Sequence, residues 1–245
     1  MARFNRLLVA VGAALLLTSV FLYLFDYLLF KGQVYIYFLS DLAFMPLEVL
    51  LVTLILRQVL NEQEKRTQLE KMNMVVGAFY SEVGVRLITE FSRLDPQVED
   101  VREELLVTDR WSDQQFLSVR AKLKSFDYSV DIHEANLVEL KAFLVKKREF
   151  LVRILENPML LEHQSFTELL RAVFHITEEL EARKSLSGLP ESDLAHLALD
   201  VKRAYNPLVS EWLDYMKYMK SNYPYLFSLA MRTNPFDVNA SPIVK

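Results

Sequence analysis

The first sixty residues contain two long apolar runs on either side of a short polar turn. The runs cover residues 7–25 and 34–60, and the turn covers residues 31–33. A helix needs roughly 20 apolar residues to cross a bilayer, so each run is long enough. A cleaved signal peptide would have a shorter apolar core followed by small residues, whereas bulky side chains end the first run. The pattern predicts a transmembrane hairpin over residues 1–60, with helices at about 7–30 and 34–60.

Positive charges gather at the open end of this hairpin. Arg3 and Arg6 precede the first helix, and Lys31 is the only cation in the turn. Further cations lie at or beyond the end of the second helix: Arg57, Lys65, Arg66 and Lys71. Loops that carry an excess of Lys and Arg stay in the cytoplasm. We therefore expect a two-pass protein of the cell inner membrane, with both termini in the cytoplasm and the turn outside.

The helical spacing of apolar residues continues without a break beyond residue 60. The apolar positions recur about every turn of a helix: Leu60, Leu69, Met72, Val76, Phe79, Val83 and Leu87. Asp95 and Pro96 then predict the start of a new helix, because proline is favoured in a first helical turn and aspartate at the preceding N-cap. Residues 61–95 are therefore expected to form a helical stalk that continues the second transmembrane helix.

The remaining pattern predicts a cytoplasmic helical bundle over residues 96–222. Helix starts are marked at residues 112–115, 131–134 and 165–168, where a capping side chain is followed three residues later by Glu or Gln. Helices are expected at 97–107, 113–125, 133–156, 165–185 and 191–222, and residues 223–245 form an aromatic tail with three prolines. No segment alternates apolar and polar residues as a strand would. The predicted fold is all-α, with a two-helix transmembrane hairpin continuing through the stalk into the bundle.

Three segments resemble a known group of proteins. They are "DLAFMPLEVLLVTLILRQVLNEQEKRTQLEKMNMVVGAFYSEVG" at 41–84, "LLEHQSFTELLRAVFHITEEL" at 160–180 and "YPYLFSLAMRTNPF" at 223–236. These segments are similar to a group of uncharacterised two-pass bacterial membrane proteins with a cytoplasmic helical domain. The resemblance covers most of the chain from the second membrane helix onward. It implies an integral membrane protein and supplies no mechanism.

The second apolar run contains two carboxylates and a proline. Asp41 and Glu48 are seven residues apart, so they share one face of a helix, and Pro46 lies between them. A charged side chain at the bilayer centre costs about 2.5–3.5 kcal/mol. Three interpretations stay open. The carboxylates line a pore or cation site between subunits, Glu48 is protonated and hydrogen-bonds a neighbouring helix near Thr18 and Ser19, or Asp41 caps the helix at the interface and Glu48 lies shallow.

Charge is distributed unevenly along the chain. It has 28 Lys and Arg and 32 Asp and Glu residues, but only four of these cations and three of these anions lie in the first sixty residues. The rest of the chain is therefore polar and mildly acidic. This balance argues against nucleic acid as a partner, because phosphate binding needs a basic face. The chain has no cysteine, which excludes disulfides and thiolate metal sites.

Two histidines have a carboxylate one helical turn away, His175 with Glu179 and His196 with Asp200. Helical bundles can hold metals between carboxylate and histidine side chains of facing helices, so these four residues are a secondary candidate for a metal site. The competing interpretation is a set of surface ion pairs, which a bundle rich in carboxylates forms by chance. The sequence lacks the phosphate-binding, dinucleotide, zinc-protease and serine-hydrolase motifs. We therefore expect no catalytic residue, no cofactor and no enzymatic activity.

The functional prediction from sequence is a membrane-anchored scaffold or signalling module. It would be an oligomer, because a single hairpin leaves Glu48 without a partner, and its helical domain would bind a cytoplasmic protein. The alternative is an oligomeric cation channel or ion-sensing assembly in which Asp41 and Glu48 are the acidic positions.

Overall fold

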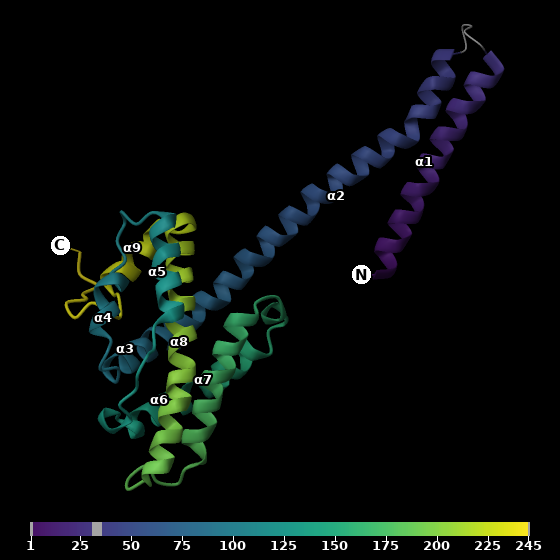
Figure 1. Cartoon of the computed structure of the whole chain (residues 1–245). Coiled ribbons are helices and arrows are strands. Elements are labelled where there is room, and N and C mark those ends of the chain that lie inside the picture. The colour runs from purple at the N-terminus through teal and green to yellow at the C-terminus, as the bar shows by residue number, and fades with distance from the viewer. Residues whose placement is uncertain (1, 31–35, 245) are drawn as a thin grey trace. The chain divides into compact units, whose positions relative to one another are not determined.

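The computed structural model describes residues 2–30 and 36–244, and all regular secondary structure within these ranges is helical. The predicted polar turn at 31–33 lies outside the described residues. The chain divides into two compact units, Met1–Gln68 and Leu69–Lys245 (Figure 1). The predicted all-α class is therefore confirmed for the described chain, and the two units are considered separately below.

The first unit is a pair of packed helices. It contains α1 (Ala2–Phe30) and the first part of α2 (Ile36–Phe79). Small residues set the contact between them: the Ser19 hydroxyl donates a hydrogen bond to the Ala43 carbonyl, and a Cβ added to Gly12 would lie 3.1 Å from Leu50 Cδ1. These contacts are seven residues apart on both helices, which is the register of an antiparallel pair. Small residues at a helix contact allow close approach of the backbones, as in membrane proteins.

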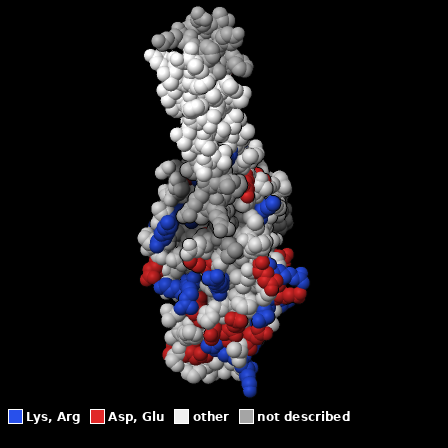
Figure 2. Space-filling model, turned by 90° about the vertical axis from the view of Figure 1, so that its right-hand side faces the viewer, with Lys and Arg blue, Asp and Glu red and all other residues white. Residues whose placement is uncertain are grey.

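The outer surface of this helix pair is strongly apolar. Large apolar side chains on it, such as Leu17, Leu28 and Ile55, are more than 60% exposed. Stretches within Ala10–Leu29 and Asp41–Arg93 are long and apolar enough to cross a membrane, and only 12% and 11% of their apolar windows are buried. The described part of the hairpin surface is almost wholly free of charge in Figure 2, whereas charged side chains of both signs cover the second unit.

The second unit is a bundle in which α8 occupies the centre. Its elements follow the end of α2 in this order: a π-helical turn (Tyr80–Gly84), α3 (Val85–Arg93), α4 (Glu99–Arg102), a 3₁₀ turn (Glu103–Leu105), α5 (Asp113–Ser125), a 3₁₀ turn (Ile132–Glu134), α6 (Leu137–Leu155), a 3₁₀ turn (Pro158–Glu162), α7 (Gln164–Ala182), α8 (Glu191–Asn222) and α9 (Pro224–Arg232). Helix α8 packs against α3, α5, α7 and α9, and α7 packs against α6 (Figure 1).

The segment predicted as a stalk is divided between the two units. Residues 69–93 belong to the second unit, and Val76, Phe79, Leu87 and Phe91 are each at most 4% exposed in its core. A stalk in water would show charged residues all round, but these apolar side chains pack against the bundle. Helical periodicity shows which face of a helix is apolar, but it does not show whether other helices pack against that face. It therefore cannot distinguish a free stalk from a core helix.

Several helix starts differ from the predicted ones because other side chains cap them. The predicted capping box at Ser112 forms and starts α5. The side chain of Asp131 caps only a 3₁₀ turn, and α6 starts later, where Asn136 accepts from the backbone N–H of Glu139. Helix α7 is capped by His163, whose ring nitrogen accepts from the N–H of Phe166. Asparagine and histidine acceptors satisfy the free N–H groups of a first turn in the same way as serine does.

The predicted helix at 97–107 is a short helix followed by a 3₁₀ turn. Asp95 does accept a hydrogen bond from the N–H of Gln97, but α4 begins only at Glu99. The tail contains one further helix, α9, which was not predicted because prolines usually interrupt helices. Phe227 and Phe236 from this region are buried, and the Phe236 ring lies 5.5 Å from that of Trp212. The first part of the tail therefore contributes to the core, whereas apolar side chains near its end, such as Val238 and Ile243, are exposed.

Candidate metal centre

Four side chains from α7 and α8 meet at the packed face of the two helices. They are the secondary candidates found in the sequence, His175 and Glu179 on α7 and His196 and Asp200 on α8. Asp200 Oδ2 lies 3.4 Å from His175 Nε2 and 3.3 Å from His196 Nε2. The Glu179 carboxylate lies 3.9 Å from His175 Nε2 and 3.8 Å from His196 Nε2. The ligand atoms of both histidines and Asp200 all lie within 4.8 Å of one another.

Local structure brings these residues together. Helix α7 buries a stripe at helical spacing, including Leu169, Val173 and Ile176, which leaves His175 and Glu179 on an adjoining face. Gly188 then takes a φ of 71°, a conformation that favours glycine, in the short connection to α8. The connection allows the two helices to pack against each other, so the two pairs spaced by four residues lie face to face.

Asp200 is the buried centre of the group. Its side chain is 1% exposed, while those of His175 and His196 are 42% and 50% exposed. Oδ1 accepts a hydrogen bond of 2.6 Å from Arg203, but Oδ2 is buried without any hydrogen-bond partner. A buried carboxylate oxygen without a partner costs free energy. Oδ2 points at the two imidazole nitrogens, so a group bound there would satisfy it.

The two short distances are compatible with ion pairs to protonated histidines and with a shared metal ion. N–H···O hydrogen bonds have donor–acceptor distances of about 2.7–3.2 Å, so 3.3 and 3.4 Å are long for direct bonds. Metal bonds of about 2.0–2.1 Å at tetrahedral angles place two ligand atoms about 3.3–3.4 Å apart. The spacing of Asp200 Oδ2 from both histidines therefore matches the edges of a tetrahedral coordination site.

Glu179 is held in place by an arginine clamp. Arg183 donates to the Glu179 carboxylate at 2.8 Å, and it forms a two-bond pair with Asp193 at 2.7 and 2.9 Å. The hydrogen bond from Arg183 holds the pKa of Glu179 below its ordinary value, with further help from the charges of Arg183 and the two histidines. Glu179 is therefore anionic at neutral pH and faces both imidazoles from the more exposed side.

The carboxylates of the hairpin are not brought into such a site. Asp41 and Glu48 are exposed on the side of α2 that faces away from α1, and Pro46 is buried in the unit. One of the three open interpretations has Glu48 hydrogen-bonded to a neighbouring helix near Thr18 and Ser19, and within this chain those two hydroxyls have other acceptors. They bond to the carbonyls of Ala14 and Ala43, because backbone carbonyls lie within closer reach. Across the described residues, neither carboxylate makes a hydrogen bond or an ion pair.

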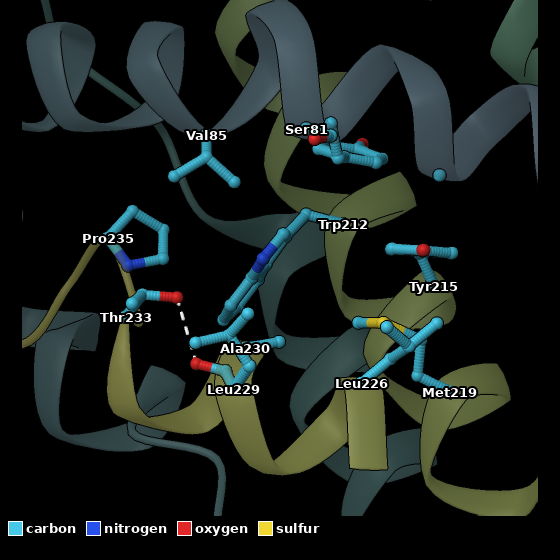
Figure 3. A pocket seen from close by; sticks show the side chains of 12 residues that line it. Ser81, Val85, Trp212, Tyr215, Met219, Leu226, Leu229, Ala230, Thr233 and Pro235 are labelled. Carbon is cyan, nitrogen blue, oxygen red and sulfur yellow. Dashed lines mark hydrogen bonds between the residues drawn. The ribbon is translucent and has the colours of Figure 1, made fainter. Parts of the chain in front are cut away.

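A second feature is an apolar hollow of about 170 Å³ at the other end of α8. Figure 3 shows that Ser81 and Val85 reach it from the π-helical turn and α3, and that Trp212 and Tyr215 reach it from α8. Leu226 and other side chains of α9 and the following residues close it. The Thr233 hydroxyl in its wall already donates to the Leu229 carbonyl at 2.9 Å, as drawn in Figure 3. No charged side chain lines this hollow among the described residues, so it lacks the groups that coordinate a metal.

Two arginines that bond the candidate metal ligands were not predicted from the sequence. Arg203 follows Asp200 by three residues and Arg183 follows Glu179 by four, spacings at which side chains on a helix meet. The sequence contains both spacings. It does not show that Asp200 is buried or that Glu179 faces the histidines, so the role of the two arginines could not be predicted from it.

The comparisons with known proteins place the whole chain in one family. Residues 68–232 match a family model described as "Uncharacterized protein MJ1433, C-terminal helical domain", and residues 3–60 match "MJ1433, N-terminal helical domain". The boundary between these matches agrees with the division of the structure near residue 68. No solved structure matches the chain.

A full-length relative gives the same result. The chain is 45% identical over 243 residues to the uncharacterized protein MJ1433 of Methanocaldococcus jannaschii, and the match covers 98% of this chain and 97% of the relative. The predicted resemblance to an uncharacterised helical family is confirmed, whereas membrane insertion and a bacterial origin are not part of what the comparisons show. The chain belongs to the MJ1433 family, whose N- and C-terminal parts are both helical.

Proposed function

We propose that this protein is a membrane-anchored module that binds one divalent transition-metal ion in its helical domain and acts as a metal-responsive scaffold or signalling protein. His175, His196 and Asp200 bind the ion, and Glu179 completes or closes the site. The observation that carries the proposal is the buried Asp200 Oδ2, which has no hydrogen-bond partner and lies 3.3–3.4 Å from two imidazole nitrogens.

The ligand types restrict the metal. Imidazole nitrogen with carboxylate oxygen suits Zn²⁺, Fe²⁺, Co²⁺ or Ni²⁺, whereas Mg²⁺ and Ca²⁺ prefer all-oxygen sites. Zn²⁺ is the first choice, because it accepts tetrahedral nitrogen and oxygen ligands. Arg203 and Arg183 orient Asp200 and Glu179, as hydrogen-bond partners behind metal ligands generally do.

Zinc titration of the full-length protein in detergent tests this proposal. We expect one Zn²⁺ per chain, with affinity at least about 100-fold lower in His175→Ala and His196→Ala, because each removes a ligand. His133→Ala is the matched control, since this histidine is 58% exposed and pairs with Glu191 elsewhere in the domain. A wild-type protein that binds no metal after chelator treatment would overturn the proposal, as would equal affinity in all three variants.

Membrane anchoring is the second part of the proposal. The hairpin helices expose their apolar residues on a surface far larger than a soluble monomer usually shows. Because the chain has no cysteine, single cysteines report topology cleanly. A membrane-impermeant maleimide should label Gln33→Cys in intact cells and should label Arg153→Cys only after permeabilisation. Release of the protein by an alkaline carbonate wash would contradict integral insertion.

A cation channel or ion-sensing assembly is the second candidate function. The exposed, unpaired positions of Asp41 and Glu48 on the outward face of α2 favour it, because such carboxylates in a bilayer need another subunit or water. Light scattering in detergent should then give an oligomer, and Glu48→Gln should change cation flux into liposomes. A monomer with no flux would remove this candidate and leave the metal-binding proposal intact.

The proposed partners follow from this architecture. They are the lipid bilayer, further copies of the chain through the hairpin, and a cytoplasmic protein that binds the helical domain. The acidic balance of the domain keeps nucleic acid outside the proposal.

A further inference from the structure

An open cleft of about 430 Å³ lies directly beside the metal ligands. It runs along α7 and α8 and is lined by Glu168, Arg171, Ala172, His175, Arg203 and Pro207. His175 belongs both to this cleft and to the metal centre. A molecule in the cleft would therefore contact one of the proposed metal ligands.

Two arginines give the cleft unused hydrogen-bond donors. Within the described chain, Arg171 makes no hydrogen bond or ion pair. Arg203 uses one terminal nitrogen to bond Asp200, while its side chain stays 62% exposed. A guanidinium has five N–H donors in a planar fork, so both side chains keep several donors for a ligand.

The carboxylate that lines the cleft, Glu168, already has a hydrogen-bond donor. It accepts a hydrogen bond of 2.8 Å from Gln164 on the same helix. Arg203 is paired with Asp200, and Glu168 lies in the same cleft as Arg171, so carboxylates offset both arginine charges before an ion binds. A bound divalent ion beside His175 would make the cleft more positive.

We propose that this cleft binds the phosphoryl group of a small molecule between Arg171, Arg203 and the metal centre. The inference rests on the proposed metal site. A phosphoryl group fits because it has several anionic acceptor oxygens, which can pair with both arginines together, and because arginine forks match phosphate geometry. The exposed position of the arginines allows a soluble ligand to enter and leave.

Phosphate titration of the metal-loaded, full-length protein tests the inference. Co²⁺ replaces Zn²⁺ so that visible absorption reports the metal environment, and calorimetry measures phosphate affinity. Sodium phosphate should bind and change the cobalt spectrum. Arg171→Gln should weaken phosphate binding about tenfold, because it removes a charged donor, and should leave metal affinity unchanged. Arg153→Gln is the matched control, since it removes the same charge from an exposed site on α6.

The outcomes separate the inference from the proposed function. Failure to bind cobalt overturns both. Cobalt binding without a response to either sodium phosphate or the soluble phosphatidate described below, or equal ligand affinity in Arg171→Gln and Arg153→Gln, overturns the cleft alone. A second titration uses dihexanoyl phosphatidate below its micellar concentration. A response to sodium phosphate indicates that the ligand is a free phosphoryl compound. A response only to the phosphatidate indicates that the phosphoryl group belongs to a lipid headgroup.

Discussion

The two halves of α8 support regions of opposite character. The N-terminal half presents His196, Asp200 and Arg203 to the polar side chains of α7, whereas the C-terminal half presents Trp212 and Tyr215 to the apolar hollow under α9. Both regions are built on the same helix, and each contains a buried side chain, Asp200 in the first and Trp212 in the second. They differ in the chemistry of the side chains that converge there, which is charged in the first region and apolar in the second.

Around the hollow, two polar side chains have hydrogen-bond partners. The Tyr80 hydroxyl donates to the Leu208 carbonyl at 2.8 Å, and the Thr233 hydroxyl donates to Leu229. In the N-terminal region, Asp200 Oδ2 has none and faces two imidazoles. Buried polar groups are usually hydrogen-bonded in folded proteins, and this oxygen is distinguished by its position between two imidazoles, which is why we propose a metal site there. The hollow, by contrast, is explained by packing.

The largest expected effect comes from removing the central ligand of the polar region. Asp200→Asn should lower zinc affinity at least about 100-fold, because the neutral amide is a poor metal ligand and even residues behind a ligand are worth about 10–100-fold. Competition with a chromophoric chelator measures the change. Asp214→Asn, the same substitution farther along α8, should leave zinc affinity unchanged. Equal zinc affinity in Asp200→Asn and the wild type would show that Asp200 is not a zinc ligand. The two halves of α8 would then not differ in metal binding.

The apolar region should respond in stability instead. A Cβ at Gly84 would clash with the Tyr80 ring, coming within 2.9 Å of its Cε1 atom, and with Phe79 at 3.0 Å. Tyr80 cannot move away easily, because it is buried, bonded to Leu208 and stacked on Tyr215 at 5.7 Å. Gly84→Ala should therefore reduce the free energy of unfolding by about 1–3 kcal/mol, measured by urea denaturation, without changing zinc affinity.

Gly77→Ala provides the matched control for that substitution. Its Cβ would meet the hydroxyl end of Tyr215 at 2.5 Å, which is the movable end of a side chain, and alanine is favoured over glycine in a helix by about 1 kcal/mol. The cost should be smaller than that of Gly84→Ala. A larger cost would show that the π-helical turn tolerates crowding better than the helix before it.

A smaller change is expected at the exposed side of the metal centre. Glu179→Gln should lower zinc affinity about tenfold, because Glu179 lies farther from the imidazoles than Asp200 and is shared with Arg183. Titration as for Asp200→Asn checks this value. Unchanged affinity would restrict Glu179 to holding Arg183 and reduce the site to three ligands.

The smallest effect is a difference in pH dependence between the two halves. Burial raises the pKa of Asp214 to about 6, against the opposing charge of Arg120. A carboxyl with a raised folded pKa binds protons more tightly in the folded state, so its contribution to stability is complete at low pH and is lost as pH rises through about 6. Stability should therefore fall between about pH 4 and 6, and Asp214→Asn should flatten this slope.

Glu179 contributes in the opposite direction. Its pKa is lowered, so its stabilisation is present at neutral pH and disappears as pH falls below its ordinary value. Urea denaturation across pH 3–7 of wild type, Asp214→Asn and Glu179→Gln measures both slopes. The same slope from pH 4 to 6 in wild type and Asp214→Asn would show that this carboxyl does not titrate in that range.

The pairs of the metal centre illustrate how far sequence reasoning extends. His175 with Glu179 and His196 with Asp200 were visible because a spacing of four residues places side chains on one helix face. That the two faces meet, and that Asp200 is the buried member, depends on contacts between residues distant in sequence. The same limit applied at residues 69–93. The apolar periodicity of this segment was predicted correctly, but the sequence did not show that its apolar face packs against the bundle.

The sequence by itself determined the all-helical character, the two apolar helices at the N-terminus and the bounds of α5 and α8, because these follow from periodicity, charge and local capping. Only the tertiary structure decided which carboxylate is buried between the histidines, which arginines remain available and which side of α2 carries Glu48. Burial and the geometry of converging side chains arise from packing between helices, and local patterns contain no information on which faces will pack together.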